Sequence, residues 1–582
     1  MKSDSNELNM TKLNKKNQKP HDDPKTFVQG IPTSQNLVNG GRAAFLESID
    51  VTAENFLWGL DSSTLEFQKL AARVKQCKNG NVPQFLQTPS ADANDCLTDP
   101  EHAVSQILTS YALARYGHQL ENEARESIYR SLGRQAADEN PDWLHENPIL
   151  HQLKFAELPL FLGLLFAGEK EAKTLVEHGK NNLSVGFEEL LDSDGTPHSQ
   201  WVSDTHLLLA CWTRCLKYAD AANIECLEPE SQTQFEYFVR QSLRLTRKDK
   251  SLVFSSAAGF QSTNIILSAL TCYHDSDDLN IANSLLRKSS QPKAKNKSPQ
   301  EDFPDPSSNS EWAELAILQS KWLPKSPRLV VAYQNRKLIA ELSCGHVLFS
   351  GELKHELLID QAPISPSTDW EVVCWNDDRD GDFLELECEL ENGAKWQKHF
   401  FLARKDQFLL CGDSFLGLGK CEFDYSLNWA INHDIGFGSP QESTELFLTR
   451  KSKSIASIIP ISLSEWSIGR SMGNVAINDG NFSFQTMVTG DNIYCPFFVD
   501  LKPSRCRKPL TWRQLTVAEK LEIVPSSVAT GYRVQIGKQQ WLIYRSFLEN
   551  SSRTVLGQNL AVEFYVGTFN SNGTSDELIS VD

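Results

Sequence analysis

The sequence predicts an α+β protein of several domains, in which a helical bundle or an (α/α) toroid is followed by a C-terminal antiparallel β-sandwich. Apolar residues recur at helical spacing through residues 43–288, which form the predicted helical domain. Residues 311–582 instead alternate apolar and polar side chains between turn residues, as expected of the sandwich domain. The 582 residues also exceed what one ordinary hydrophobic core contains, so two large domains are expected.

The N-terminal residues 1–42 are polar and aperiodic, which predicts a disordered tail. Residues 1–20 lack the apolar stretch of about 7–15 residues that a signal peptide needs. No later stretch of about 18 apolar residues is present that would span a membrane. We therefore expect a cytoplasmic protein without a membrane partner.

Helical periodicity is clearest in residues 169–191, where Leu175, Leu183, Phe187 and Leu190 fall on one face. The dipeptide Asp194-Gly195 is expected to form a turn, and Ser203 and Asp204 are candidates to cap the following helix. Other helices are expected at 101–117, 120–133, 232–246 and 262–273. Six or more helices with short connections imply a bundle or a toroid.

Residues 289–310 are rich in Pro, Ser and Lys and have no periodicity, which predicts a linker or an exposed loop. A short helix is expected around Trp312. Beyond it the period becomes two, and turn residues between alternating runs predict antiparallel hairpins. The predicted strand pairs are 329–333 with 337–342, 383–390 with 395–402, and 532–536 with 540–544.

The charge and cysteine content restrict the partners. A formal net charge of −18 argues against nucleic acid, because phosphates are bound through clustered Lys and Arg. An acidic glycan would meet the same repulsion unless a local basic cleft acted on it within about 8–10 Å. The 13 Cys residues contain no C-x-x-C pair, so we expect reduced thiols, no metal site and no cofactor.

Three pieces of sequence between Asn147 and His206 follow one another at distinctive spacings: Asn147-Pro148-Ile149-Leu150-His151-Gln152, then the apolar run Phe161 to Gly168, then Asp194 to His206. In order and nearly in spacing they resemble the active-site region of the heparinase II/III-like polysaccharide lyases. The resemblance covers residues 140–290 directly and the C-terminal half by architecture. It implies an (α/α) toroid followed by a β-sandwich, and β-elimination in an acidic, uronic-acid-containing polysaccharide or oligosaccharide; relatives are often exported.

The resemblance also implies roles for individual residues. Asn147 matches the residue that holds the substrate carboxylate, while His151, His198 and His206 are the candidates for proton transfer. The candidates for substrate binding are Gln200, where the family has Glu, and two tryptophans that would stack on sugar rings, Trp201 and Trp375.

Several positions depart from the family pattern. Pro148 stands where the family has His, and Thr205 stands where it has Tyr. Since a threonine hydroxyl has a pKa far above that of a phenol, Thr205 does not replace tyrosine as a proton shuttle. The His-x-His-x-Asp signature of the family's β domain has no counterpart among His346, His355 and His399. These departures leave open whether catalysis survives.

Two other functional hypotheses therefore stand beside the lyase. One is a non-catalytic glycan-binding pseudoenzyme of the same fold. The other is an (α/α) toroid glycoside hydrolase that uses Asp142, Glu146 or Asp194. Structural roles are a further alternative, with Asn147 as a helix cap, His151 as a core histidine and Trp201 as a buried anchor.

Overall fold

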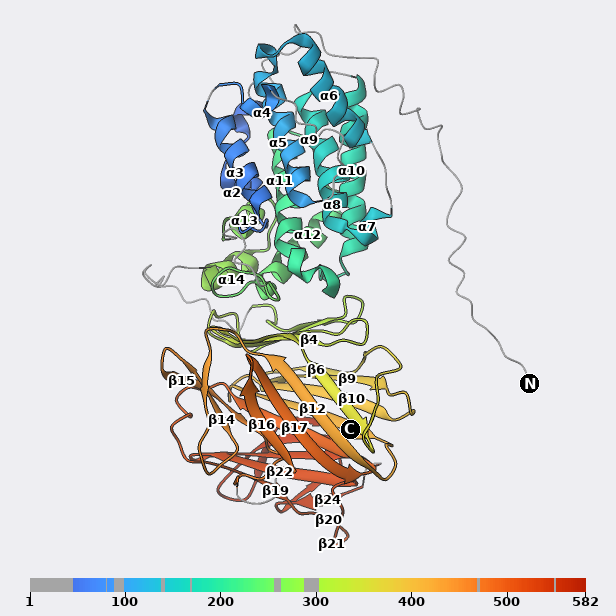
Figure 1. Cartoon of the computed structure of the whole chain (residues 1–582), viewed down its shortest axis with the longest axis vertical. Coiled ribbons are helices and arrows are strands. Elements are labelled where there is room, and N and C mark those ends of the chain that lie inside the picture. Colours follow the sequence, from blue (N-terminus) through green and yellow to red (C-terminus); the bar gives the residue numbers. More distant parts are fainter. Residues whose placement is uncertain are drawn as a thin grey trace, which may run out of the picture. The chain divides into compact units, whose positions relative to one another are not determined.

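The computed structural model describes residues 45–79, 81–87, 99–137, 142–167, 170–255, 263–286, 303–467, 472–548 and 551–582. Within them, helices come first along the chain and antiparallel sheets follow, as the colours of Figure 1 show. The predicted tail and most of the predicted linker lie outside the described residues. Across these ranges, no helix is long and apolar enough to cross a membrane.

The helices predicted at 101–117, 120–133, 169–191, 232–246 and 262–273 are confirmed, and most of their ends agree to within a few residues. In the described ranges they are α2 (Ala53–Phe56), α3 (Leu65–Lys78), α4 (Gln84–Gln87), α5 (Pro100–Tyr116), α6 (Asn122–Ala137), α7 (Trp143–Glu146), α8 (Pro148–His151), α9 (Leu158–Leu165), α10 (Lys170–Leu190), α11 (Thr205–Ala221), α12 (Pro229–Leu245), α13 (Thr263–Ala269) and α14 (Ser276–Leu286). A π-helix, η4, spans Gln152–Glu157, and 3-10 helices span Gly117–Gln119 (η3) and Ser199–Asp204 (η5).

The chain folds into two compact units that do not coincide with the predicted domain limits, which stay a prediction. Unit 1 contains the described residues up to Phe56, residues 68–183 and residues 214–226. Unit 2 contains residues 57–67, 184–213 and 227–582, and therefore includes helices as well as all the strands that the structure describes.

Unit 1 is built around α9, whose eight residues are all buried and which packs against α5 and α6 (Figure 1). Its core includes one buried ion pair, in which Arg214 donates to both carboxylate oxygens of Glu157 at 2.6 and 2.8 Å. Arg214 also donates to the carbonyl of Asn55 at 3.3 Å. The Arg214 guanidinium therefore connects three separate segments of unit 1, those that contain Asn55, Glu157 and Arg214 itself. Because both charges are buried, removing one partner would leave the other unpaired in the core.

Unit 2 contains five antiparallel sheets in its described part. The first has the order β1 (Ser308–Ser310), β2 (Leu315–Gln319), β3 (Pro327–Ala332), β4 (Ile339–Cys344), β5 (Val347–Glu352). The second has the order β13 (Gly436–Gly438), β14 (Leu446–Arg450), β15 (Lys453–Ile459), β18 (Ile493–Asp500), β11 (Phe408–Leu416), β10 (Lys395–Ala403), β9 (Gly381–Glu389), β8 (Glu371–Asp377). The third has the order β16 (Gly473–Asn478), β17 (Asn481–Gly490), β12 (Cys421–Ala430), β6 (Lys354–Ile359), β7 (Ala362–Pro363).

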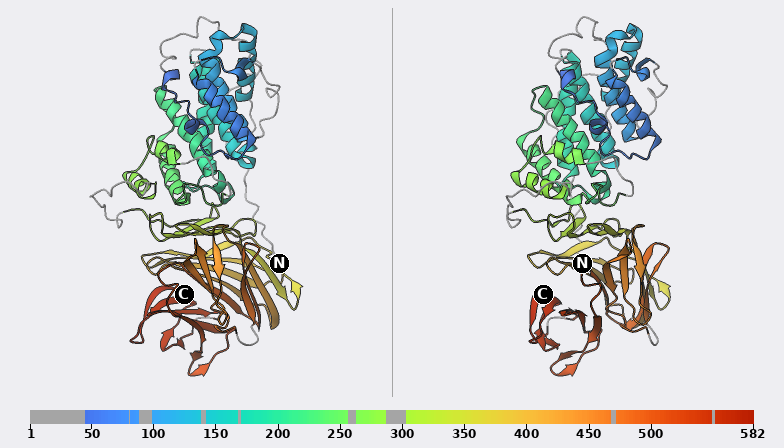
Figure 2. Two further views of the ribbon diagram at one scale, coloured as in Figure 1. Left: turned by 60° about the vertical axis from the view of Figure 1, so that its left-hand side comes forward. Right: turned by 90° about the vertical axis from the view of Figure 1, so that its left-hand side faces the viewer.

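The C-terminal strands form two more sheets. Their orders are β19 (Leu510–Leu515), β22 (Ala529–Ile536), β23 (Gln539–Ser546), β26 (Phe564–Phe569), β27 (Ser575–Val581), and β21 (Glu522–Ile523), β20 (Val517–Glu519), β24 (Arg553–Val555), β25 (Gln558–Leu560). Figure 2 shows these strands, coloured red, as a layer of their own within unit 2. The predicted hairpins β3–β4, β9–β10 and β22–β23 are confirmed by their registers.

The helix predicted around Trp312 is wrong. Residues 311–314 form the tight turn between β1 and β2, whose terminal residues Ser310 and Leu315 are paired. The Ser310 hydroxyl accepts a hydrogen bond from the Ala313 backbone nitrogen at 3.0 Å, and Glu314 has a positive φ of 50°. Strand pairing on both sides limits the segment to a single turn, closed by the Glu314 backbone nitrogen donating to the Glu311 carbonyl at 3.2 Å, so a helix cannot continue from it. β1 itself lies within the predicted linker.

The predicted turn at Asp194-Gly195 is confirmed. Gly195 has φ +71°, and a Cβ atom there would lie 2.4 Å from the backbone nitrogen of Phe238. The Asp192 carboxylate accepts from the backbone nitrogens of Asp194 and Thr196 at 2.9 and 2.7 Å. Both the backbone conformation and the close approach of α12 require glycine at this position.

The first sheet of unit 2 is covered on both faces, because alternate residues of its strands belong to different cores. Leu315, Ile317 and Val330 pack in one cluster with Val202 of η5 and with Leu245, at the end of α12. Residues between them, such as Ala316 and Leu318, belong to the large core of the following sheets. This alternation holds the segment around His198–His206 on the first sheet.

Candidate functional site

Asn147 lies at the start of α8 and caps it. Its side-chain oxygen accepts from the backbone nitrogen of Leu150 at 3.2 Å, and Pro148 occupies the first helical position. The side chain is half-buried, and its amide nitrogen donates to no residue that the structure describes. Asn147 can therefore cap α8 with its side-chain oxygen and still offer its amide nitrogen to an anion.

His151 lies in the apolar interior of unit 1. The ring is 3% exposed, and its Nδ1 accepts from Gln152 Nε2 at 3.1 Å. Burial, with smaller effects of His178 and His145, lowers the pKa of His151 to about 4. His151 is thus neutral near pH 7, and Phe155 packs on its ring edge at 5.2 Å.

His206 lies in the first turn of α11 and is buried in unit 2. Its Nε2 is 3.1 Å from the Thr246 hydroxyl, which donates its own hydrogen to the carbonyl of Ser242 at 2.6 Å. His206 is therefore the donor, with its proton on Nε2, and burial lowers its pKa to about 4. The neighbouring Thr205 is fully buried and donates to the Val202 carbonyl at 2.9 Å.

His198 has a different environment, since it meets the turn between β1 and β2. Its Nε2 is 3.6 Å from an oxygen of Glu314, and the ring of Trp312 lies edge-on at 5.8 Å. The Ser199 backbone nitrogen donates to the Ala313 carbonyl at 2.7 Å, which fixes the two segments together. We call His198, Trp312 and Glu314 the His198 cluster.

The members of the His198 cluster remain in contact with solvent. The side chains of His198 and Glu314 are 25% and 33% exposed, and Trp312 is 50% exposed. Among the three predicted catalytic histidines, all of them within the described residues, His198 is the most accessible. The cluster combines a titratable pair with an open aromatic surface of the kind that stacks on sugar rings.

Partial burial shifts both titratable groups toward their neutral forms. It lowers the pKa of His198, and it raises the pKa of Glu314, with a further contribution from Asp369. The His198 Nδ1 accepts from the Gln200 backbone nitrogen at 3.4 Å, so that Nε2 carries the proton toward Glu314. Glu314 also keeps its backbone at φ +50°, a conformation that non-glycine residues adopt at a cost of about 1–3 kcal/mol.

The predicted substrate-binding residues are distributed differently. Gln200 is exposed and Trp201 is half-buried, both in η5 beside His198. Trp375 is on β8 and packs, partly buried, against the large core of the sheets. Among the residues described, no contact joins Trp375 to the His198 cluster. Asn147 and His151 belong to unit 1, and the other predicted site residues belong to unit 2.

Sequence reasoning missed Trp312 and Glu314. Trp312 lies between two acidic residues in a hairpin turn, whereas the sequence pattern predicts a helix there, in which these side chains would not meet His198. The pairing of Ser310 with Leu315 is a long-range property of the sheet, and it brings Glu314 to His198. The only local signal was a large aromatic residue in a stretch of polar ones.

The remaining histidines of the sheets do not gather around a metal position. His355, on β6, has a side chain that is 7% exposed, and its Nε2 lies 3.5 Å from Lys398, which is paired with Asp413 at 2.7 Å. His399 follows Lys398 on β10 and is therefore on the other face of that strand, where its Nε2 lies 2.8 Å from the Tyr494 hydroxyl. Within the described ranges, no group of three or more His, Cys, Asp or Glu side chains is arranged to hold a metal ion.

Among known proteins, solved structures resemble this chain, and the resemblance is in the fold. No protein-family model matches the sequence, and no curated protein matches it. Among solved structures, heparinase III has a TM-score of 0.57 at 10% identity, and the match covers 83% of this chain and 82% of that one. The heparan sulfate lyase HepC from Pedobacter heparinus has a TM-score of 0.54 at 12% identity, with the same two coverages. The chain thus shares the fold of these polysaccharide lyases.

Proposed function

We propose that this protein is a polysaccharide lyase that acts on a uronic-acid-containing glycan by β-elimination, with its helices arranged as an (α/α) toroid. The observation that carries the proposal is the His198 cluster, a partly exposed histidine paired with a carboxylate beside an exposed tryptophan. Its occurrence in a chain with a lyase fold favours this chemistry over other uses of the same residues.

In β-elimination, a base removes the proton next to the uronate carboxyl and an acid protonates the departing oxygen. The neutral His198 accepts a proton at Nδ1 and gives up the weak 3.4 Å bond from Gln200. Glu314, 3.6 Å from Nε2, then stabilises the imidazolium that forms, and the imidazolium returns the proton to the departing oxygen. Trp312 offers an apolar surface to the sugar ring.

The other roles rest on the resemblance. The Asn147 amide nitrogen would donate to the substrate carboxylate and favour the negative charge that develops on it. His151 and His206 stay candidates for proton transfer, but both rings are buried, at 3% and 7% exposed. Gln200 and Trp201 would contact the saccharide from η5, and Trp375 from β8.

A second candidate is a glycan-binding protein that no longer cleaves. Thr205 stands at the position of the family's tyrosine, and its hydroxyl is buried and committed to the Val202 carbonyl. A hydroxyl in this environment does not deliver a proton to a leaving group. This observation favours binding without turnover, in which Trp312 and Gln200 keep their contacts with sugar.

The lyase proposal is tested by incubating the purified chain with a panel of uronic-acid glycans and following ultraviolet absorbance of the unsaturated product. We expect His198→Ala to reduce the initial rate about a hundred- to ten-thousand-fold, the usual effect of losing an acid–base group. His118→Ala, a change at an exposed histidine of unit 1, is the matched control and should leave the rate unchanged. Absence of the chromophore with every glycan at high protein concentration would refute the lyase, and retained glycan binding would then support the second candidate.

A further inference from the structure

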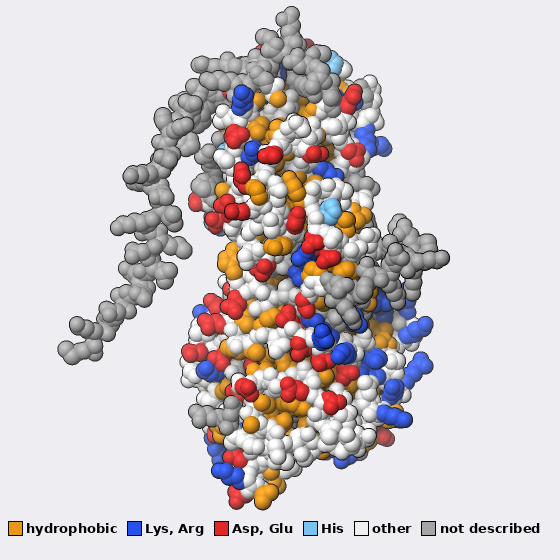
Figure 3. Space-filling view, turned by 180° about the vertical axis from the view of Figure 1, so that it is seen from behind, with side chains coloured by type: hydrophobic (Ala, Val, Ile, Leu, Met, Phe, Trp, Pro, Cys, Tyr) orange, Lys and Arg blue, Asp and Glu red, His pale blue; other side chains and the backbone are white. Residues whose placement is uncertain are grey.

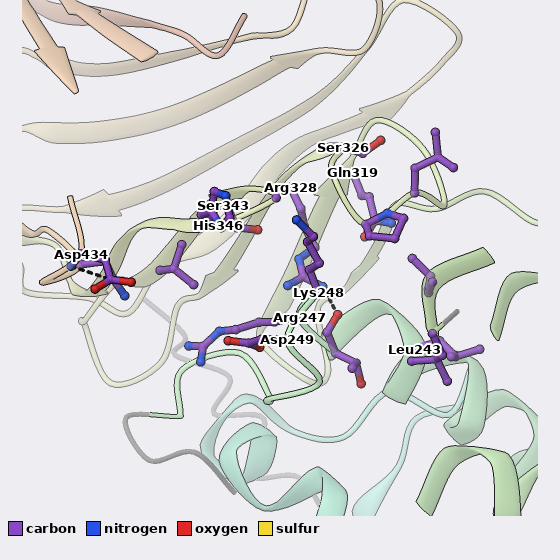
Figure 4. A pocket seen from close by; sticks show the side chains of 18 of the residues that line it. Leu243, Arg247, Lys248, Asp249, Gln319, Ser326, Arg328, Ser343, His346 and Asp434 are labelled. Atoms are coloured by element: carbon purple, nitrogen blue, oxygen red, sulfur yellow. Dashed lines mark hydrogen bonds between the residues drawn. The ribbon is translucent and has the colours of Figure 1, made fainter. Parts of the chain in front are cut away.

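Unit 2 contains a cavity of about 400 Å³ that the proposed chemistry does not use. Side chains from residues 243–249 lie on one side of it, and Gln319 and Ser343 of the first sheet, with His346 of the turn between β4 and β5, lie on the other (Figure 4). Its volume falls within the roughly 300–1,000 Å³ that small-molecule sites occupy. The cavity is therefore large enough for a ligand rather than for a few waters.

The cavity and the His198 cluster lie at opposite ends of the first sheet. The turns 311–314 and 333–338 join β1 to β2 and β3 to β4, so they share one end of this antiparallel sheet. The cavity is lined from the turns 320–326 and 345–346, which join β2 to β3 and β4 to β5 at the other end. A ligand in this cavity thus binds at a separate place from the His198 cluster.

Positive charge dominates the lining. Its four permanent cations are Arg247, Lys248, Arg328 and Arg450, against two carboxylates, those of Asp249 and Asp434. The surface of unit 2 is uneven in the same way, since Figure 3 shows basic side chains gathered along one edge of its strand-rich part. A chain with a net charge of −18 therefore keeps a local cationic cavity, which is the condition for binding an anion.

The cations differ in whether they already form hydrogen bonds or ion pairs within the protein. Arg247 donates to buried Glu341 at 2.8 Å, and Arg328 donates to the Thr246 carbonyl at 2.9 Å, so both belong to the framework. Lys248 is exposed and makes no hydrogen bond or ion pair with any residue that the structure describes. Lys248 is thus a cation available to a ligand.

Arg450 and His346 form the second polar wall of the cavity. Arg450 donates to His346 Nε2 at 3.2 Å and to Asp434 at 3.2 Å. Burial lowers the pKa of His346, and the nearby charges of Arg450 and Lys248 lower it further. His346 accepts the Arg450 hydrogen bond in its neutral form, and an anion placed here would relieve the repulsion among these groups.

Gln319 lines the cavity, but its side-chain oxygen is enclosed by the protein. Gln319 is 4% exposed, its amide nitrogen donates to the Lys321 carbonyl at 3.0 Å, and its side-chain oxygen has no partner among the described residues. A buried acceptor without a donor costs about 1–3 kcal/mol. Because that oxygen is enclosed by the protein, Gln319 belongs to the framework and not to the part of the lining that a ligand reaches.

Apolar side chains also line the cavity beside the charged and polar groups, namely Leu243, Leu285, Leu286, Leu323, Pro324 and Val347. A saccharide ring matches this combination, since it carries hydroxyl donors and an apolar face of C–H groups. An acidic substituent on the ring would match the cations.

We propose that this cavity is a second binding site, for a short acidic saccharide whose carboxylate or sulfate is held by Lys248 and Arg450 and whose ring packs on the apolar side chains of the lining. The site does not require that the protein cleave glycans. It would hold an acidic saccharide, such as a chain end or a released fragment, away from the His198 cluster.

Binding is measured by calorimetry on the full chain carrying His198→Ala, so that cleavage does not consume the ligand. The probes are an unsulfated uronic-acid tetrasaccharide, a sulfated one, a neutral tetrasaccharide and inorganic sulfate. We expect one or both acidic tetrasaccharides to bind, and their comparison tells whether carboxylate or sulfate is preferred. Equal binding of inorganic sulfate, or of the neutral tetrasaccharide, would overturn the proposal.

Two substitutions and a control locate the binding. Adding Lys248→Ala or Arg450→Ala should weaken the acidic tetrasaccharide about tenfold or more, the usual effect of losing a charge-assisted hydrogen bond. Lys420→Ala changes an exposed lysine that does not line the cavity and should leave the affinity unchanged. Unchanged affinity in both cavity variants would refute the site.

Hydrogen–deuterium exchange separates this proposal from the lyase. The acidic tetrasaccharide should protect backbone amides of residues 243–249 and 345–347. Protection restricted to residues 198–204 and 311–314 would overturn the second site while leaving the lyase proposal intact. Protection of 243–249 and 345–347 without a chromophore in the cleavage assay would support the second site and count against the lyase.

Discussion

At the scale of single residues, two histidines of unit 2 with similar sequence signals have opposite environments. His198 and His206 flank the same short helix, η5, yet one is partly exposed beside a carboxylate and the other is buried against Thr246. The sequence predicted both as candidates because spacing along the chain does not report burial. Only the first sheet, which is formed by distant residues, decides which ring meets solvent.

The buried His206 should make the protein sensitive to acid. Its pKa is about 4 in the folded chain against an ordinary value of 6.5, so the unfolded chain binds the proton more readily. The stabilising effect is present above pH 6.5 and is lost as the pH falls toward 4. Between pH 7.5 and 5 this group alone should reduce the free energy of unfolding by about 2 kcal/mol.

Urea unfolding of the wild-type chain and of His206→Gln at both pH values checks this expectation. Glutamine keeps a donor for Thr246 but does not titrate, so the variant should lose about 2 kcal/mol less than the wild type on acidification. Comparing the change with pH, rather than the stability itself, removes the effect of altered packing. An identical loss in both proteins would contradict the buried, neutral state of His206.

At the scale of elements, local patterns predicted well wherever a turn and two matching runs were close in sequence. The alternating stretches around Glu391-Asn392-Gly393 form β9 and β10, and the Asp194-Gly195 turn forms as expected. The turn at 311–314 was missed because its strands, β1 and β2, are short and β1 lies in a stretch with linker composition. β1 forms because its backbone pairs with β2, and this pairing does not depend on an apolar pattern in β1 itself.

The Asp194-Gly195 turn gives an element-scale prediction. Gly195→Ala should destabilise the protein by more than the roughly 1–2 kcal/mol that a left-handed backbone costs an L-residue, since its Cβ would meet the α12 backbone at 2.4 Å. Gly393→Ala is the matched control, because Gly393 has φ +81° but nothing within 4 Å of an added Cβ. Equal changes in the free energy of unfolding would show that the contact with α12 has no cost.

At the scale of the whole molecule, the order of helices and sheets was predictable and the division into compact units was not. Residues 57–67 and 184–213 lie among the predicted helices but belong to unit 2. Periodicity shows that a segment has an apolar face, but not which other segment covers that face. The same limit explains why the cavity, lined from residues 243–249 and from the first sheet, was absent from the sequence-based predictions.

The net charge of the whole chain also bears on how an acidic saccharide binds. The charge of −18 repels a polyanion at long range, while the cations of the cavity attract it within about 8–10 Å, the screening length near physiological salt. If the local contacts with Lys248 and Arg450 control affinity, raising the salt concentration from 50 to 300 mM should weaken binding of an acidic tetrasaccharide. The slope should be shallower in Lys248→Ala, which has lost one of the cations, than in Lys420→Ala. Affinity that instead rises with salt would mean that global repulsion outweighs the cavity and that its cations do not hold the ligand.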